Sequence, residues 1–171
     1  GSFGLTGNVG KRCGAGVSLT DVTRMPYHGY LGPDVDSIDV LEQYLEDASS
    51  GLDLPAALVL ETVQAEGGVN VASKQWLQEV QTAAHETGAL LIIDDIQVGC
   101  GRTGSFFSFD GMELDPDIVT LAKGIGGYGT PMAMNLVKPE HDIWSPGEHT
   151  GTFRGQGLSF VTGREALTYF E

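Results

Sequence analysis

An acid and an amine stand at the ends of two apolar runs of this sequence. Asp94 follows residues 90–93 (LLII), and Lys123 follows residues 118–122 (IVTLA). Short apolar runs of this kind predict strands buried in a parallel sheet, and ligands of such sheets bind at the carboxyl ends of the strands. Gly124, next to Lys123, lets the backbone approach a ligand closely. The pattern suits a cofactor that is bound covalently by the amine and tuned electronically by the acid.

Other roles remain open for these residues. Lys123 could be a solvated lysine at a strand end, and Asp94 and Asp95 could cap the strand or form a metal pair. Strand alternation places Asp94 and Ile96 on one face and Asp95 on the other. This favours one buried acid, Asp94, beside an apolar neighbour over a shared metal site. The four histidines also lack metal-ligand spacing, so no metal site is predicted.

Three further segments could contribute polar groups to a site. Glu61 ends another apolar run and Glu66 lies in the loop 64–70, although each could equally be a solvated carboxylate. The hydroxyl and amide groups of residues 150–152 (TGT) could bind a phosphate. Residues 124–129 match the dinucleotide-binding pattern GxGxxG, but that pattern requires a helix to begin there. A Thr-Pro pair and a strand-like run follow instead, which argues against nucleotide binding.

The elements that must position these residues alternate between strand and helix. Apolar runs predict strands over residues 22–27, 57–61, 90–93, 118–122 and 132–137. Periodicity and capping residues predict helices from Asp36 or Ser37 to residue 48, from Ser73 to Thr87, and from Gln156 or Ser159 to Phe170. Residues 105–109 (SFFSF) predict a short helical turn packed on the core. The alternation predicts an α/β fold with a mostly parallel sheet.

Composition excludes several classes of partner. The 171 residues carry a net charge of −14, from 23 acids against 9 bases, whereas nucleic acids and anionic membranes require basic patches. Cys13 and Cys100 show no CxxC spacing, which argues against a disulfide framework. The sequence contains no apolar stretch of membrane-spanning length and does not open with a signal peptide, so a cytoplasmic location is expected.

Four segments together resemble the class III aminotransferases, the pyridoxal-phosphate enzymes of fold type I. They are ETVQAEGG (61–68), LLIIDDIQVGCGRTG (90–104), DIVTLAKGIGGYGTP (117–131) and GEHTGTFRGQ (147–156). The amino-acid sequence of the second half is most similar to that of the diaminobutyrate–2-oxoglutarate transaminase branch. The resemblance extends from about residue 6 onward and implies a three-layer, mostly parallel sheet, the central part of the large domain of this fold.

The resemblance also implies roles for individual residues around pyridoxal 5'-phosphate. Lys123 would attach the cofactor covalently and then move a proton between substrate and cofactor. Asp94 would pair with the ring nitrogen and keep it protonated. Ile96 would pack on one ring face, and Gln97 would contact the ring hydroxyl. Thr152 would reach the phosphate of the cofactor in a partner subunit, which implies a homodimer or a higher homo-oligomer.

The implied reaction transfers an amino group from L-glutamate to L-aspartate 4-semialdehyde, giving L-2,4-diaminobutyrate, an ectoine or siderophore precursor, and 2-oxoglutarate. Glu66 would be a substrate-binding gate that pairs with an arginine when no dicarboxylate is bound. Other ω-amino acids, such as ornithine or 4-aminobutyrate, are alternative substrates. A nucleotide-binding domain and a catalytically inert α/β assembly module are alternatives of a different class.

The sequence departs from the family pattern in two ways. Asp95 stands where most of the class has Glu, and Arg154 and Gln156 stand where many members have Gly and Asn. These differences are features of the diaminobutyrate branch. They narrow the choice of subfamily and do not change the resemblance to the class III aminotransferases. The upstream phosphate loop, the ring-covering aromatic residue and the C-terminal small domain with its substrate arginine are not found in residues 1–171. The chain is therefore expected to be a fragment of the large domain and to be inactive alone.

Overall fold

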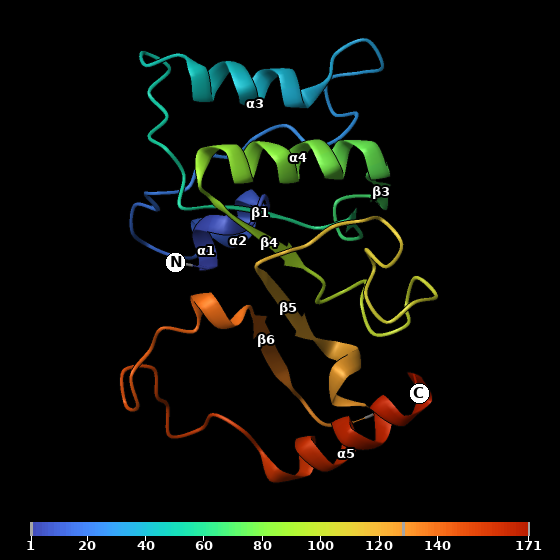
Figure 1. The fold of residues 1–171 in the computed structure, drawn as a ribbon. Helices are drawn as coiled ribbons and strands as arrows, with labels where there is room; N and C mark the ends of the chain where they lie inside the picture. Colours follow the sequence, from blue (N-terminus) through green and yellow to red (C-terminus); the bar gives the residue numbers. More distant parts are fainter. Residues whose placement is uncertain (1, 128, 171) are drawn as a thin grey trace. The chain divides into compact units, whose positions relative to one another are not determined.

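The computed structural model describes residues 2–127 and 129–170 and divides the chain into two compact units, Gly1–Leu54 and Pro55–Glu171 (Figure 1). The first unit contains α1 (Ser2–Leu5), α2 (Val9–Cys13) and α3 (Ser37–Glu46). Asp36 begins α3 by accepting a 3.0 Å hydrogen bond from the Ile38 amide, as its position predicts. The unit also contributes the long irregular segment between α2 and α3.

The prediction of a strand over residues 22–27 is wrong. These residues are irregular, and the described part of the first unit contains no strand. A strand needs a hydrogen-bonded neighbour, and Pro26 lacks the amide proton that would donate to one. The apolar residues of this segment therefore do not indicate a strand.

The second unit is built on a four-stranded sheet in the order β1-β4-β5-β6. The strands β1 (Ala57–Leu60), β4 (Leu90–Asp94) and β5 (Ile118–Ala122) are parallel, and β6 (Ala133–Val137) is antiparallel to β5. The mostly parallel α/β sheet is thus confirmed. A small antiparallel pair, β2 (Val63–Gln64) and β3 (Asn70–Val71), follows β1. The unit is completed by α4 (Lys74–Thr87), α5 (Gly157–Leu167) and the short 3-10 helices η1 (Lys123–Gly126), η2 (Pro139–His141) and η3 (Thr168–Phe170).

The helix α4 begins and ends where its sequence predicts. The Ser73 hydroxyl accepts a 3.2 Å hydrogen bond from the Trp76 amide, and Gly88 closes the helix in the left-handed conformation at φ 73°. Its apolar side is buried, with Leu77 and Ala84 almost fully enclosed. The helix lies against β4 and β1 and so supports the strand that carries Asp94 (Figure 1).

The two faces of the sheet differ in burial. On one face Leu91, Ile93 and Leu121 have no more than 1% of their surface exposed. Phe106, Phe107 and Phe109 pack on this face next to β5. Residues 105–109 form bends and turns rather than the expected helical turn, although they do pack on the core. The opposite face is only partly covered and carries Asp94 opposite Thr120 in register.

The two neighbouring aspartates lie on opposite faces as predicted, but the more deeply buried one is Asp95, not Asp94. Asp95 has no exposed surface and accepts a 3.2 Å hydrogen bond from the Ser108 amide. Burial raises the pKa of the Asp95 carboxyl, and hydrogen bonds from Ser108 oppose the shift. Gly99 is required beside it, because a Cβ at that position would lie 2.4 Å from the Asp95 carboxylate. Asp95 is therefore a structural acid beneath the site.

A second buried acid, Asp117, ties three elements together at the other end of the sheet. Its carboxylate accepts hydrogen bonds from the Leu91 amide at 2.8 Å, Lys138 Nζ at 3.1 Å and His141 Nε2 at 3.3 Å. Burial alone would raise the pKa of Asp117. The Leu91 amide and the Lys138 ammonium outweigh burial and hold the pKa below its ordinary value. The anion thus links β4, η2 and Lys138, which follows β6 directly.

Asp117→Asn is expected to lower the free energy of unfolding at neutral pH by about 1–2 kcal/mol, because it removes the charge that pairs with Lys138. The folded-state pKa of Asp117 is depressed, so its stabilisation is present above the unfolded value and is lost as pH falls through the folded value. Urea unfolding at a series of pH values measures this. Asp142→Asn, at an exposed position, is the control. An equal loss of unfolding free energy in both variants would contradict the inference that the charge of Asp117 stabilises the fold.

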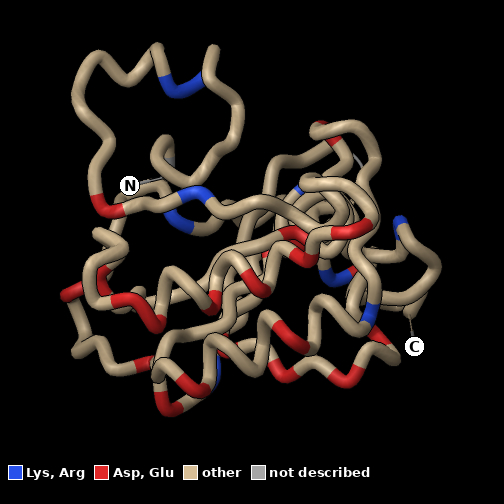
Figure 2. Tube along the Cα trace, turned by 90° about the horizontal axis from the view of Figure 1, so that it is seen from above, with Lys and Arg blue, Asp and Glu red and all other residues tan. Residues whose placement is uncertain are grey.

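The sequence contains 23 acids and 9 bases. Acidic positions are spread over many parts of the trace (Figure 2). Among the described residues, no helix is long and apolar enough to cross a membrane.

Candidate active site

The candidate site forms where the carboxyl ends of β1, β4 and β5 meet. The register pairs Leu60 with Ile93 and Asp94 with Thr120, so Glu61 follows β1 next to the end of β4. Lys123 comes directly after β5, in the first position of η1. The positions of Asp94 and Lys123 at neighbouring strand ends are as the sequence predicts.

A chain of hydrogen bonds runs from Lys123 to Glu66. Lys123 Nζ donates to Gln97 Oε1 at 2.9 Å, and Gln97 Nε2 donates to Glu66 Oε1 at 3.3 Å. Three residues from separate parts of the sequence are thereby brought together: one after β5, one after β4 and one in the loop between β2 and β3. Gln97 separates the lysine ammonium from the Glu66 carboxylate and binds both.

The backbone at Lys123 has a left-handed conformation with φ 51°, which is uncommon for a residue with a side chain. Such conformations cost of order 1–3 kcal/mol and persist only where the surrounding structure enforces them. Here the tight η1 turn follows immediately, and a Cβ on Gly124 would lie 2.9 Å from the Cys100 Cβ. The close packing of this turn fixes the point from which the lysine side chain leaves the sheet.

Asp94 is half-buried on the partly covered face of the sheet. Its Oδ1 atom accepts a 3.1 Å hydrogen bond from the Ile96 amide, which ties the carboxylate to the turn after β4. The neighbouring Thr120 has a buried Oγ1 atom without a hydrogen-bond partner among the described residues. An unpaired buried hydroxyl is costly, and a bound polar group next to Asp94 would satisfy it.

Glu61 belongs to the same group of charges, although the sequence alone left open whether it was a site residue or a solvated carboxylate. Burial raises the pKa of the Glu61 carboxyl, the charge of Asp94 raises it further, and the Lys123 ammonium opposes the shift. Charges must lie within several ångströms of one another to act in this way. The sequence does contain a pattern that could have identified Glu61 as a site residue. Glu61 and Asp94 each come directly after an apolar run, and these runs form neighbouring strands.

The remaining predicted site residues are placed differently. Ile96 is half-buried in the turn that holds Asp94. Thr152 is exposed in the irregular segment between η2 and α5, and in the described part of the chain it forms no hydrogen bond with the other predicted site residues. The first glycines after Lys123 lie within the four-residue η1, and the chain then continues to β6. This segment therefore lacks the long helix that a dinucleotide-binding turn requires, as expected.

The candidate site places an amine beside carboxylates. The comparison with known families agrees with this arrangement. Residues 1–171 match the family described as Aminotransferase class-III. The chain belongs to the class III aminotransferases.

Relatives of this class III aminotransferase chain include two curated proteins named diaminobutyrate–2-oxoglutarate transaminase. The one from Halalkalibacterium halodurans is 55% identical over 171 residues, covering 100% of this chain and 40% of the relative. The one from Bordetella parapertussis is 57% identical, covering 99% of this chain and 39% of the relative. The chain thus spans about two-fifths of the length of these relatives.

Solved structures of similar proteins show the same fold. An (S)-enantioselective ω-transaminase from Thermomicrobium roseum is 25% identical with a TM-score of 0.81, and 99% of this chain and 40% of that chain are covered. An ornithine aminotransferase from Toxoplasma gondii is 34% identical with a TM-score of 0.68, and 78% of this chain and 31% of that chain are covered. These similarities agree with the confirmed α/β fold of the class.

The residues of the site fit pyridoxal phosphate. Lys123 could provide the amine that an aldehyde cofactor requires, and Asp94 could provide an anion at the adjacent strand end. The unpaired Thr120 hydroxyl and the Gln97 amide add neutral polar groups around these charges. The donor set therefore matches a cofactor with an aldehyde, a basic ring nitrogen and a ring hydroxyl.

Proposed function

We propose that this chain is the central part of the cofactor-binding domain of a pyridoxal-phosphate-dependent transaminase. The proposed reaction converts L-glutamate and L-aspartate 4-semialdehyde into 2-oxoglutarate and L-2,4-diaminobutyrate, an ectoine or siderophore precursor. The observation that carries the proposal is the Lys123–Gln97–Glu66 chain beside Asp94. The names of relatives at 55% and 57% identity support the choice of substrate.

When bound, pyridoxal phosphate supplies an aldehyde that condenses with amines and a ring that draws electrons from the attached carbon. Lys123 would hold it at the aldehyde and would later carry a proton to and from the substrate carbon. The 2.9 Å hydrogen bond to Gln97 orients the lysine amine, and the η1 turn fixes its origin. Gln97 would also contact the ring hydroxyl, and Ile96 would pack on the ring.

Asp94 would hold a proton on the ring nitrogen, because a nearby anion favours the cationic form of a basic group. Its carboxylate is kept in place by the Ile96 amide. Glu61 would add negative charge near Asp94, and the Lys123 ammonium balances part of it. The half-buried environment strengthens these interactions relative to bulk water.

Glu66 would control which substrate the enzyme accepts. Glutamate has a distal carboxylate that requires a cation, whereas diaminobutyrate has a distal amine that a cation repels. A carboxylate that covers an arginine in one half-reaction and moves away in the other resolves this conflict. Glu66 is exposed and is followed by Gly67 and Gly68. Among the described residues its side chain is held by one 3.3 Å hydrogen bond, from Gln97, so it has the freedom to move.

Experiments on activity require an enzyme of the relatives' length. We define the chimaeric enzyme as the Halalkalibacterium halodurans relative in which the matching segment is replaced by residues 1–171. The proposal predicts glutamate-dependent formation of diaminobutyrate by this enzyme. Preference for ornithine or 4-aminobutyrate over diaminobutyrate would favour the alternative substrates. Absence of any transamination, in a folded enzyme that binds pyridoxal phosphate, would contradict the proposed function.

In the chimaeric enzyme Glu66→Ala is expected to slow the diaminobutyrate half-reaction about 10- to 100-fold more than the glutamate half-reaction, because the arginine would then stay uncovered. Stopped-flow absorbance of each half-reaction measures this. Glu86→Ala, at an exposed position on α4, is the matched control and should change neither. An equal loss in both half-reactions would make Glu66 a structural loop residue.

The isolated chain is expected to bind little pyridoxal phosphate and to show no turnover. Lys123 and Asp94 are present, but the phosphate loop and the ring-covering aromatic residue of the family are not found in residues 1–171. Absorbance titration of the isolated chain tests this expectation. Stoichiometric covalent binding by the chain alone would contradict it.

A homodimer or higher homo-oligomer is also proposed. The helix α5 packs through small residues, since a Cβ on Gly163 would lie 2.8 Å from the Ile125 carbonyl oxygen. Its larger apolar residues point outward, with Leu158 and Val161 exposed by 69% and 68%. An exposed apolar surface of this kind is typical of a protein–protein interface. Light scattering on the chimaeric enzyme measures its oligomeric state.

A cytoplasmic site of action is proposed as well. Cys13 and Cys100 are both free thiols. Free thiols are typical of proteins in a reducing compartment.

A further inference from the structure

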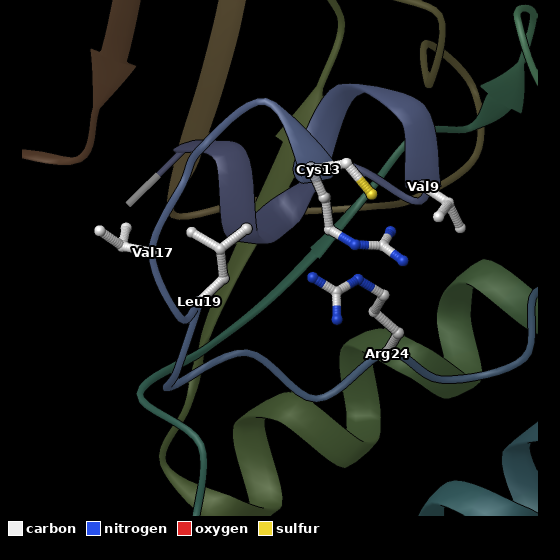
Figure 3. Close-up of a pocket in the computed structure, with 6 residues that line it drawn as sticks. Val9, Cys13, Val17, Leu19 and Arg24 are labelled. Atoms are coloured by element: carbon white, nitrogen blue, oxygen red, sulfur yellow. The ribbon is translucent and has the colours of Figure 1, made fainter.

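A second concave site lies in the first unit, on residues that the proposed reaction does not use. It is a shallow, open pocket of about 310 Å³ between α2 and the irregular segment that follows it (Figure 3). We call it the arginine pocket. Its lining combines two cations with apolar side chains and one thiol: Val9, Arg12, Cys13, Val17, Leu19 and Arg24.

The two arginines of the pocket converge on one neutral acceptor. Arg12 Nη1 donates to the Thr6 carbonyl oxygen at 2.7 Å, and Arg24 Nε donates to the same oxygen at 3.4 Å. Arg24 Nη2 also donates to the Gly4 carbonyl oxygen. The two positive charges are therefore held close together. Like charges a few ångströms apart repel by about 1 kcal/mol in water and by more near a protein surface, and a carbonyl group does not cancel this repulsion.

No acid of the described segments, 2–127 and 129–170, compensates this pair. Neither guanidinium forms a salt bridge there, although Lys74 and Lys138 each pair with a carboxylate at 2.8 Å. This is unusual in a chain with 23 acids and only 9 bases. Each guanidinium has five N–H donors, and the three hydrogen bonds above use only part of the set. The pocket thus retains both charge and donors for an anion.

We propose that the arginine pocket binds a small organic carboxylate. A guanidinium matches the two oxygens of a carboxylate with two parallel N–H donors, and two guanidiniums can hold the group from different sides. An anion placed between them would also remove their mutual repulsion. The cavity volume is at the lower end of the range for small-molecule sites, so the ligand is of metabolite size.

The apolar part of the lining selects an organic anion over inorganic phosphate. Val9 and Val17 are 63% and 74% exposed, and Leu19 completes the apolar side of the cavity. A hydrocarbon chain attached to the carboxylate would cover these side chains and gain about 25 cal/mol for each square ångström removed from water. Phosphate can bind the arginines but offers nothing to the valines and the leucine.

The experiment is a titration of the 171-residue chain, labelled with ¹⁵N, at constant ionic strength. Butyrate supplies a carboxylate with a short hydrocarbon chain, inorganic phosphate supplies an anion without one, and butylamine supplies the chain with the opposite charge. The Nε–H signals of Arg12 and Arg24 report binding at the pocket itself. We expect saturable shifts with butyrate, at least fivefold weaker binding of phosphate, and no saturable shifts with butylamine.

Variants locate the binding site and separate it from a structural role. Arg24→Ala is expected to weaken butyrate binding at least tenfold, and Arg24→Lys, which keeps one charge but not the fork, about threefold to tenfold. Arg164→Ala, which removes an arginine on α5, should leave binding unchanged. Arg12→Lys provides a second test if Arg24→Ala disturbs the folded spectrum.

Three results would overturn the proposal. Butyrate that gives no saturable shifts at either arginine would remove the site. Equal affinity in the wild type, Arg12→Lys and Arg24→Lys would show that the arginines only bind the Gly4 and Thr6 carbonyls. Phosphate that binds as tightly as butyrate, or more tightly, would exclude the organic carboxylate as the preferred ligand.

Discussion

Lys123→Ala in the chimaeric enzyme is expected to reduce turnover by at least about 10⁴-fold while pyridoxal phosphate still binds noncovalently. The variant removes the only amine in the hydrogen-bond chain with Gln97 and Glu66 among the described residues. It also removes the group that would carry a proton at the substrate carbon. Asp94, Gln97 and the turn after β4 would remain to hold the ring, so affinity should fall less than rate.

Borohydride reduction followed by peptide mass spectrometry measures which lysine carries the cofactor. The chain has three other lysines, Lys11, Lys74 and Lys138, and the latter two pair with acids. Lys74→Ala is the matched control and should leave turnover unchanged. Label found on one of these lysines instead of Lys123 would end the assignment.

The parts of the fold that sequence reasoning predicted correctly are those fixed by neighbours in the chain. The apolar run before Lys123 forms β5, and Ser73 and Gly88 bound α4 because caps act on amides and carbonyls a few residues away. The segment 22–27 has the composition of a strand but lacks a strand to pair with in its unit. Strand formation depends on such distant partners, which a local pattern does not contain.

The positions of the candidate site residues could be predicted only in part, for the same reason. Asp94 and Lys123 were identifiable because each ends its own strand. The contribution of Glu61 depends on the register of β1 against β4, which joins residues about 30 positions apart. The greater burial of Asp95 depends on the packing of Ser108 and Gly99 against it. Two adjacent aspartates look alike in a sequence, and only the tertiary packing distinguishes their surroundings.

Because Asp94 and Asp95 differ in their surroundings, the same substitution should affect turnover differently at the two positions. Asp94→Asn in the chimaeric enzyme is expected to lower the rate by about 10²-fold or more, because it removes the anion that would keep the ring nitrogen protonated. The amide keeps the shape of the carboxylate and can still accept the 3.1 Å hydrogen bond from the Ile96 amide. The local fold should therefore survive, and the loss should come from charge.

Asp95→Asn is the matched comparison, since it makes the same chemical change one residue away on the opposite face of the sheet. Burial already raises the pKa of Asp95, so loss of its charge should affect turnover far less than the Asp94 change. Turnover is measured together with the absorbance spectrum of the bound cofactor across pH, which reports protonation of the ring directly. A spectral change in Asp94→Asn alone is the expected result. Equal losses of rate in the two variants, with unchanged spectra, would show that Asp94 supports the structure and does not contact the ring.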